Sequence, residues 1–347
     1  MTQHTRTTEE PIAQVRLGTD GPLVGVQGLG CMGMSEFYGT TDEKAARETL
    51  ETALDAGVTL FDTADMYGRG ANEEFLAPFV QTHRDRIVLA TKFAVERGDD
   101  DSIRGVRNDP AYIRGAVDAS LRRLGIDTID LYYMHRRDPA VPLAESVGAM
   151  AELVAAGKVR HLGLSEVTGS ELREAHAVHP IAALQSEWSL FSRDVEQGRL
   201  SAVDAARELG VAFVPYSPLG RGFLTGAFTD AAAELSQRDY RTTQPRFTGA
   251  NAHANAALLE PLRTIARNRD ATVGQVALAW VQQRAQVHAP LAVIPIPGTR
   301  KATRLRENVA ATRLILTEEE LAALEPIAAQ VAGDRYADMS LTSAGRE

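Results

Sequence analysis

The segment FDTADMYG, residues 61–68, places Asp62 and Tyr67 directly after a short apolar run. Lys92 in ATKF (residues 90–93) and His135 in LYYMH (residues 131–135) stand in the same position relative to the next two apolar runs. Side chains at the ends of three strands can meet around one bound atom if the strands are parallel neighbours, as in a β/α barrel. These three segments therefore predict both a fold and a candidate active site.

Short apolar runs of β type recur along the chain, with helical patterns between them. This alternation indicates βαβ units and a parallel sheet, and eight units are enough to close a barrel. The sequence therefore predicts an α/β fold, a (β/α)8 TIM barrel in a single domain. The expected strands are residues 27–32, 58–61, 87–90, 129–133, 159–164, 182–185, 211–215 and 291–295.

Several expected helices carry their own start and stop signals. Asp42 can cap a helix that Gly57 ends, and Asp109 precedes a proline at the first position of another helix. Residues 142–157 repeat this arrangement, and Thr317 with Glu320 reads as a capping box that opens a final C-terminal helix. These signals place helices where a barrel requires them.

Two regions depart from a plain repeat. The interval between the seventh and eighth runs, residues 216–290, is much longer than the others and predicts an insertion. We expect a long loop over the barrel mouth at residues 218–245, then helices near residues 252–268 and 273–284. Asp20-Gly21 lies between two apolar runs at residues 15–17 and 23–26, which predicts an N-terminal β-hairpin that plugs the barrel floor.

Bulk composition restricts the class of protein. The chain has 347 residues, of which 44% are hydrophobic and 24% charged, as in ordinary globular proteins. Its net charge of −9 argues against nucleic-acid binding, and one cysteine, Cys31, leaves no internal disulfide or cysteine-based zinc site. Without a signal peptide or an apolar stretch of membrane-spanning length, we expect a cytoplasmic protein. We expect residues 1–13 to be a flexible N-terminus, residues 14–332 to form the barrel, and residues 333–347 to be a frayed tail.

The four polar residues suit the reduction of a carbonyl. Hydride addition leaves negative charge on oxygen, so a proton donor must stand beside it, and Tyr67 is the candidate. Lys92 would supply a cation that lowers the pKa of Tyr67, while Asp62 would keep the ammonium charged and fixed. His135 would orient the substrate oxygen. Any one of these residues alone is more often structural, but their common position at three successive strand ends favours the catalytic interpretation.

These motifs resemble those of the aldo-keto reductases, and the resemblance covers residues 14 to 330. FDTADMYG, ATKF and the YYMHR segment match the catalytic tetrad motifs of that family. The resemblance implies an NADPH-dependent (β/α)8 reductase of aldehydes and ketones in which Tyr67 is the general acid, with Asp62, Lys92 and His135 as the other catalytic residues. No metal is implied.

The cofactor is not expected on a Rossmann domain, because no convincing G-x-G-x-x-G follows an early strand. Residues 294–308 offer another anchor: Thr299 can cap a helix whose free N–H groups attract phosphate, and Arg300 and Arg304 can clamp its oxygens. This favours a 2′-phosphate and hence NADPH over NADH. The alternative is a solvated basic helix surface.

Further cofactor contacts are implied by the family resemblance. Ser165 and Gln185 would hold the nicotinamide carboxamide, and Tyr216 would stack on its ring. Glu166 departs from the asparagine often found there, which puts a carboxamide contact at that position in doubt. The remaining implied positions are Ser217, Leu219, Gly220, Arg221 and Gly222 in a loop covering the pyrophosphate, Gly298 beside Thr299, and Glu307 and Asn308 near the adenine.

The substrate pocket is expected to be partly aromatic, with Phe37, Tyr38, Phe93 and Trp188 as its walls, although each could instead be packing. The sequence does not name the small-molecule carbonyl or the oligomeric state. A second class remains open: the potassium-channel beta subunits resemble the same family, bind NADPH and act as regulatory partners. A third, a barrel for phosphorylated sugars, leaves Lys92 and Tyr67 unexplained.

Overall fold

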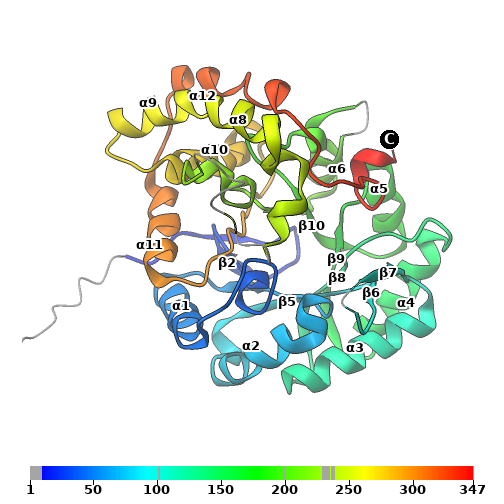
Figure 1. Ribbon diagram of the computed structural model, residues 1–347. Helices are drawn as coiled ribbons and strands as arrows, with labels where there is room; N and C mark the ends of the chain where they lie inside the picture. The colour runs from blue at the N-terminus through cyan, green and yellow to red at the C-terminus, as the bar shows by residue number, and fades with distance from the viewer. Residues whose placement is uncertain (1–9, 101, 199–200, 229–234, 236–238, 347) are drawn as a thin grey trace, which may run out of the picture.

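A parallel sheet of seven strands forms most of a barrel in the computed structural model, which describes residues 10–100, 102–198, 201–228, 235 and 239–346. The strands follow one another in the spatial order β11-β10-β9-β8-β5-β4-β3, and helices surround them (Figure 1). The α/β barrel predicted from the sequence is therefore confirmed. The strands are β3 (Leu29–Gly30), β4 (Leu60–Asp62), β5 (Val88–Phe93), β8 (Ile129–Met134), β9 (Val159–Ser165), β10 (Ile181–Glu187) and β11 (Ala212–Tyr216).

The eighth expected strand closes the barrel without being a regular strand. Phe213 pairs with Val293 in an isolated parallel bridge, and Ile296 N donates to Pro215 O at 3.0 Å. On the other side, Gly28 N donates to Pro295 O at 2.9 Å, next to β3. The segment stays irregular because proline has no N–H to contribute to a strand ladder.

The predicted N-terminal hairpin is present. Strands β1 (Gln14–Arg16) and β2 (Leu23–Gly25) pair antiparallel, with Val15 opposite Val24. Leu17 and Val24 are wholly buried in the same cluster as the inward-facing side chains of the barrel strands, such as Leu131. The hairpin therefore contributes side chains to the interior of the barrel.

The capping signals mark real helix starts. Asp42 accepts from Ala45 N, Asp109 accepts from Tyr112 N, and Thr317 forms a full capping box with Glu320. Each of these contacts satisfies a backbone N–H that would otherwise lack a partner in the first turn. The α-helices are α1 (Glu43–Asp55), α2 (Ala71–Thr82), α3 (Pro110–Leu124), α4 (Leu143–Ala155), α5 (Gly169–Val178), α6 (Ala202–Leu209), α8 (Gly249–Ala257), α9 (Glu260–Asn268), α10 (Val273–Val287), α11 (Ala302–Ala310) and α12 (Glu318–Leu324).

The insertion after β11 differs from the expectation in one respect. The single helix expected at residues 252–268 is two helices, α8 and α9, because Pro261 stands in the first turn of α9 and starts a new helix there. The described part of the loop before them consists of short 3-10 turns, η5 (Gly220–Thr225), η6 (Tyr240–Thr243) and η7 (Pro245–Phe247). Residues 229–234 and 236–238 of the predicted loop lie outside the described residues.

Two further features were not predicted. A second hairpin, β6 (Val95–Arg97) with β7 (Ile103–Val106), follows β5 directly. The expectation of a frayed C-terminal tail is wrong for residues 335–346, which lie beside α5 (Figure 1): Arg346 pairs with Glu171, and Arg335 is only 2% exposed. The predicted flexibility of the N-terminus falls mostly on residues 1–9, which lie outside the described residues.

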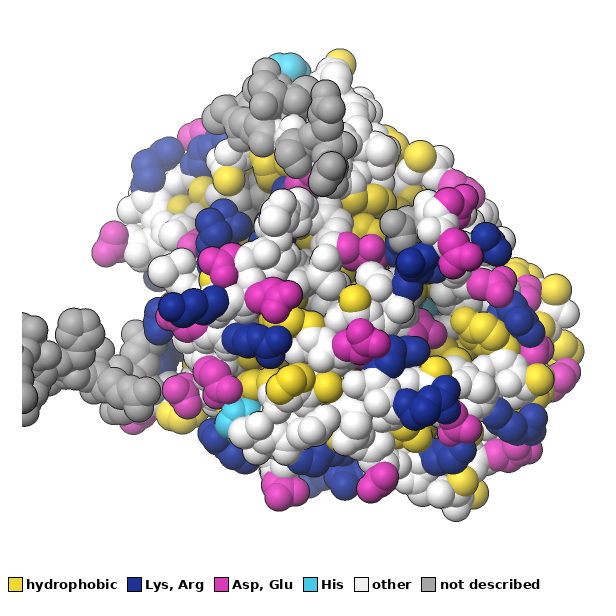
Figure 2. Space-filling view, turned by 60° about the horizontal axis from the view of Figure 1, so that its bottom comes forward, with side chains coloured by type: hydrophobic (Ala, Val, Ile, Leu, Met, Phe, Trp, Pro, Cys, Tyr) yellow, Lys and Arg dark blue, Asp and Glu magenta, His cyan; other side chains and the backbone are white. Residues whose placement is uncertain are grey.

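The surface is charged with both signs. Acidic and basic side chains are interspersed over the face shown in Figure 2. None of the helices in the described part of the chain has the length and apolar character needed to span a bilayer.

Candidate active site

The four polar side chains picked out by the sequence meet at the carboxyl ends of neighbouring strands. Asp62 ends β4, Lys92 lies near the end of β5, and His135 follows β8. These strands are adjacent, since β4 pairs with β5 and β5 pairs with β8. Tyr67 begins a 3-10 turn, η2 (Tyr67–Gly70), that brings its ring back over the strand ends.

The Lys92 ammonium is the centre of this group and is completely buried. Its Nζ donates to Asp62 Oδ1 at 2.5 Å, to Thr63 O at 2.7 Å and to the Tyr67 hydroxyl at 3.4 Å. Burial lowers the pKa of Lys92, and the Asp62 carboxylate opposes that shift. Three acceptors thus fill the three donors of the ammonium and fix its position.

The pKa of Tyr67 differs from the expectation. Burial raises it well above its usual value and Asp62 raises it further, so Lys92 does not produce the lowered pKa that the sequence suggested. The physical reason is first that burial disfavours the charged phenolate, and second that the nearby Asp62 carboxylate opposes negative charge on the phenol. Tyr67 therefore holds its proton at neutral pH, as a general acid must.

His135 stands edge-on to Tyr67, with ring centroids 5.9 Å apart and planes at 86°. Burial, then the neighbouring Arg136 and Lys92, hold the pKa of His135 well below its usual value, so its ring is neutral. Its buried Nδ1 has no hydrogen-bond partner among the described residues. A neutral imidazole with a buried nitrogen that has no protein partner among the described residues can form a hydrogen bond with an uncharged oxygen.

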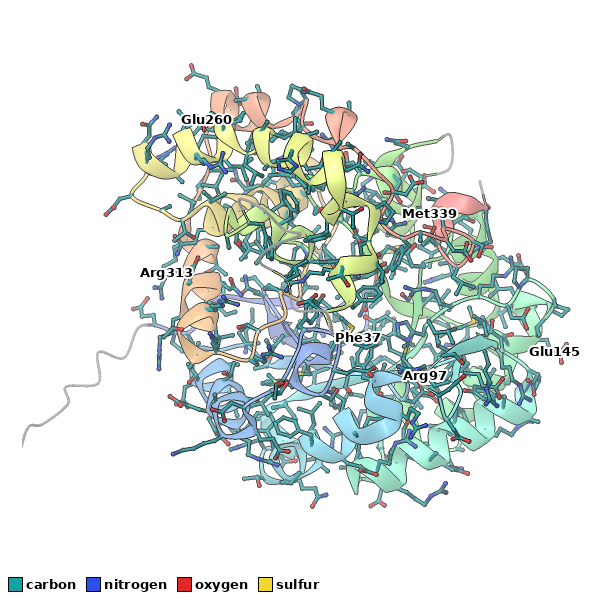
Figure 3. All side chains as sticks on the ribbon, in the orientation of Figure 1. Phe37, Arg97, Glu145, Glu260, Arg313 and Met339 are labelled. Atoms are coloured by element: carbon teal, nitrogen blue, oxygen red, sulfur yellow. The ribbon has the colours of Figure 1, made fainter. Side chains whose placement is uncertain are left out.

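The expected substrate walls divide into two groups. Phe37 packs edge-on to the Tyr67 ring at 6.4 Å and lies beside Arg97 (Figure 3), while Tyr38 pairs through its backbone with Asp239 of the insertion. Phe93 and Trp188 are fully buried in the cluster between strands and helices, where they pack against Tyr132 and Phe213. The prediction that these two line the pocket is wrong, because their side chains face the outer core. Residues packed with Tyr67 instead are Met32, Phe37, Ala64, Met66 and Val95.

The residues expected around the nicotinamide lie side by side at the ends of β9, β10 and β11. Gln185 Nε2 donates to Asp62 Oδ2 at 2.8 Å, which ties it to the catalytic group. The Ser165 hydroxyl accepts from Arg136 at 3.3 Å, and the Tyr216 hydroxyl donates to Glu166 Oε1 at 2.8 Å. Glu166 is therefore bonded to protein groups, which explains why a carboxylate can stand there.

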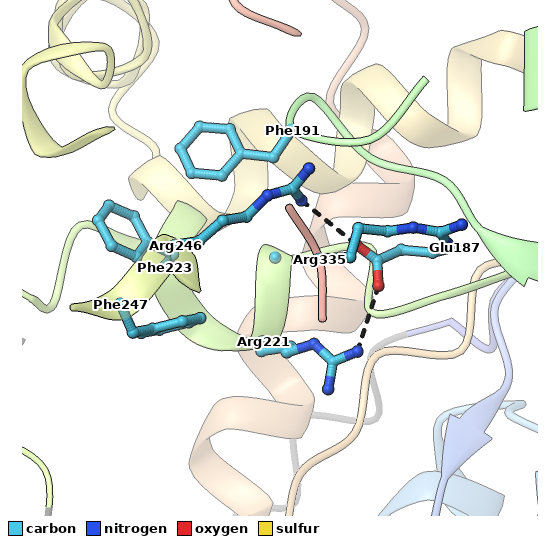
Figure 4. Close-up of a pocket in the computed structure, with 8 residues that line it drawn as sticks. Glu187, Phe191, Arg221, Phe223, Arg246, Phe247 and Arg335 are labelled. Carbon is cyan, nitrogen blue, oxygen red and sulfur yellow. Dashed lines mark hydrogen bonds and ion pairs between the residues drawn. The ribbon is translucent and has the colours of Figure 1, made fainter. Parts of the chain in front are cut away.

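The expected pyrophosphate loop has the backbone of a tight turn. Ser217, Gly220, Arg221 and Gly222 all have positive φ, and Leu219 precedes the turn η5. At Gly222 the φ of +92° favours glycine. The Arg221 guanidinium pairs with Glu187 at 3.4 Å, as Figure 4 shows, so its charge is shared with a carboxylate.

The phosphate anchor near α11 differs from the expectation. Thr299 is not the helix cap: Lys301 holds that position, no side chain caps the helix, and the Thr299 hydroxyl accepts from Lys301 N. Arg300 donates to the carbonyl oxygens of Gly33, Tyr38 and Gly39 and to Thr41, so it ties down the loop after β3. Arg304 is exposed.

The rest of this anchor is consistent with a dinucleotide. The uncapped start of α11 leaves backbone N–H groups for an anion, beside the exposed Lys301 and Arg304. A Cβ at Gly298 would come within 3.1 Å of Gly30 O, so the backbones of these two glycines approach each other closely beside β3. Glu307 accepts from Thr272 at 2.7 Å, and the buried Asn308 accepts from Gln27 through its backbone oxygen.

Sequence reasoning missed some residues at this site. Arg136, Glu187, Arg335 and Tyr336 all lie among the expected cofactor residues. Arg335 and Tyr336 occur in the expected tail, where no periodicity or spacing marks them. No group of three or more His, Cys, Asp or Glu side chains in the described part of the chain is placed to hold a metal ion.

Comparison with known proteins agrees with this geometry. Residues 28–329 match the model of the Aldo/keto reductase family, so the chain belongs to that family of oxidoreductases. It is similar to the structure of a glycerol dehydrogenase from Gluconobacter oxydans, with 28% identity, a TM-score of 0.78, and coverage of 92% of this chain and 95% of that one.

Two more solved structures are similar. One is an aldo-keto reductase from Bacillus halodurans in its holo form, with 27% identity, a TM-score of 0.73, and coverage of 94% of this chain and all of that one. The other is a thermostable aldo-keto reductase in complex with the inhibitor epalrestat. It has 28% identity, a TM-score of 0.69, and coverage of 91% of this chain and 100% of that one.

Proposed function

We propose that this protein reduces aldehydes or ketones to alcohols with NADPH, and that Tyr67 donates the proton. The observation that carries the proposal is the position of the Tyr67 hydroxyl, 3.4 Å from a fully buried ammonium and edge-on to a neutral histidine. A phenol with a raised pKa delivers its proton only when negative charge develops beside it, which happens in the transition state of carbonyl reduction.

Each of the four residues would have its own role in the reaction. Tyr67 passes its proton to the substrate oxygen, and the Lys92 ammonium stabilises the phenolate that remains. Asp62 holds Lys92 in its charged form, and His135 orients the oxygen through a hydrogen bond. NADPH, when bound, supplies the hydride.

The cofactor would be held by residues at the ends of β9, β10 and β11 and at the start of α11. Tyr216 offers a ring for the nicotinamide, Ser165 and Gln185 offer polar groups for its carboxamide, and the turn at Gly220 and Gly222 can approach the pyrophosphate closely. Lys301 and Arg304, at the uncapped start of α11, would recognise the 2′-phosphate.

Purified protein tests this proposal directly. Mixed with NADPH and a panel of aldehydes and ketones, it should oxidise the cofactor, as followed by absorbance. The same panel should include glycerol with NADP⁺, because a similar structure is named a glycerol dehydrogenase. Tight NADPH binding with no turnover of any compound would instead support a regulatory subunit like those of potassium channels.

A further inference from the structure

The C-terminal segment, residues 335–346, is fastened to the barrel by ion pairs. Arg335 donates to both carboxylate oxygens of Glu166, at 3.0 and 3.2 Å, and to Asp194 at 2.9 Å. Arg335 and Glu166 are both almost completely buried. Such a bidentate pair fixes the geometry of both partners.

The end of the segment returns to the same carboxylate. Ser343 donates to Glu166 Oε2 through its backbone N–H at 3.1 Å and its hydroxyl at 3.3 Å, and Arg346 pairs with Glu171 at 2.9 Å. Although burial raises the pKa of Glu166, Arg335 and Arg136 outweigh it and lower the value to about 2. Glu166 is therefore an ionised junction between the barrel and the segment.

Glu166 also positions the ring of Tyr216, because it binds the hydroxyl group at the edge of that ring. That hydroxyl donates to Glu166 at 2.8 Å and lies 3.1 Å from the Tyr336 hydroxyl. Among the described residues, no aromatic ring or cation packs against the ring of Tyr216. The segment thus holds this ring by its hydroxyl edge.

The same segment restrains the loop after β11. The Arg221 guanidinium lies over the ring of Tyr336, 4.6 Å from its centroid. Arg221, Arg246 and Arg335 line one small cavity with Glu187 (Figure 4). Three carboxylates, from Glu166, Glu187 and Asp194, balance these three guanidinium groups, so this cavity is not a site for a free anion.

We propose that residues 335–346 form a clasp on the cofactor site, in which Arg335 is a positioning residue that acts through Glu166 on Tyr216, and Tyr336 holds Arg221. This inference rests on the proposed function, since it assigns the nicotinamide to Tyr216 and the pyrophosphate to the loop of Arg221. A docked clasp slows the release of NADPH, because both cofactor-binding elements must move together with it.

The test is the rate of NADPH release, measured by stopped-flow fluorescence, which does not require a known carbonyl substrate. Arg335→Ala should speed release about tenfold or more, because charge-assisted hydrogen bonds to Glu166 are lost. Arg335→Lys, which keeps the charge, should recover part of the effect, and Tyr336→Ala should also speed release. Arg114→Ala is the matched control, since it breaks a surface ion pair with Glu152 on α4, outside the clasp.

The outcomes separate the two proposals. Faster release in Arg335→Ala and Tyr336→Ala, with unchanged circular dichroism and unchanged release in Arg114→Ala, supports the clasp. Normal NADPH binding by the wild type with release that is unchanged or slower in both clasp variants overturns the clasp alone. Failure of the wild type to bind NADPH or NADH overturns the proposed function and the clasp with it.

Discussion

Lys92 Nζ lies 2.5 Å from Asp62 Oδ1, and the two side chains are almost wholly withdrawn from solvent at adjacent strand ends. A buried ion pair rarely adds stability compared with apolar side chains of the same volume, because both charges lose their hydration. Its retention here is explained by position, since the same ammonium also donates to the Tyr67 hydroxyl. The pair serves the site more than the fold.

Replacing only one partner of this ion pair should therefore destabilise the protein more than replacing both partners. We expect Lys92→Met to lower the free energy of unfolding by about 3–5 kcal/mol, because the Asp62 carboxylate is left buried and unpaired. The double variant Asp62→Leu with Lys92→Met should recover most of this loss while staying inactive. Urea unfolding measures the stabilities, and additive losses in the double variant would contradict the coupling.

Tyr67→Phe should abolish proton donation without disturbing the cofactor. We expect the rate of the chemical step to fall by about 10²- to 10⁴-fold, the usual contribution of a general acid, while NADPH affinity stays near the wild-type value. Single-turnover kinetics and fluorescence titration provide the two measurements. Undiminished activity in this variant would show that another group supplies the proton.

The fold and the tetrad were predictable from the sequence because both depend on local patterns. Asp62, Lys92 and His135 follow apolar runs directly, and parallel strands place such positions at one end of a barrel. The helix starts at Asp42 and Asp109 were also local, since each depends on a contact with a residue three positions away.

What the sequence did not predict depends on contacts between distant segments. Arg335 pairs with Glu166, 169 positions away, and no spacing rule connects them. Likewise, successive side chains of a strand point to opposite faces. Phe93 follows Lys92 on β5 and therefore faces the outer core. The raised pKa of Tyr67 comes first from its burial and then from the Asp62 carboxylate, and both depend on the folded structure.

Arg300 and Arg304 should differ in their effect on cofactor selectivity. Arg304 is exposed at the start of α11, so Arg304→Ala should weaken NADPH while leaving NADH nearly unchanged. Arg300 holds the carbonyl oxygens of the loop after β3, so Arg300→Ala should weaken both cofactors. Titration of each variant with NADPH and with NADH measures the two affinities. A selective loss of NADPH in Arg300→Ala would restore it as the phosphate ligand.

Asp65 should make the protein less stable as the pH rises. Burial, then the charge of Glu73, raise the pKa of Asp65 to about 8, and its Oδ1 has no hydrogen-bond partner among the described residues. A raised carboxyl pKa means that the folded state keeps a proton that the unfolded state loses above about pH 4. Asp65→Asn should therefore stabilise the protein at pH 8 more than at pH 5, by at most about 1.4 kcal/mol per pH unit. Equal gains at both pH values would show that Asp65 is ionised in the folded protein.

His135 should make the protein less stable as the pH falls, which is the opposite of the effect of Asp65. Its pKa is held well below its usual value in the folded protein, so between that lowered value and about pH 6.5 the unfolded state binds a proton that the folded state does not. Stability from this residue is complete above about pH 6.5 and is lost as the pH falls. His135→Gln removes the titrating group, so its free energy of unfolding should decline less between pH 7 and pH 5 than that of the wild type. Urea unfolding at both pH values gives the two slopes, and equal slopes would mean that His135 takes up a proton in the folded site and cannot serve there as a neutral ring.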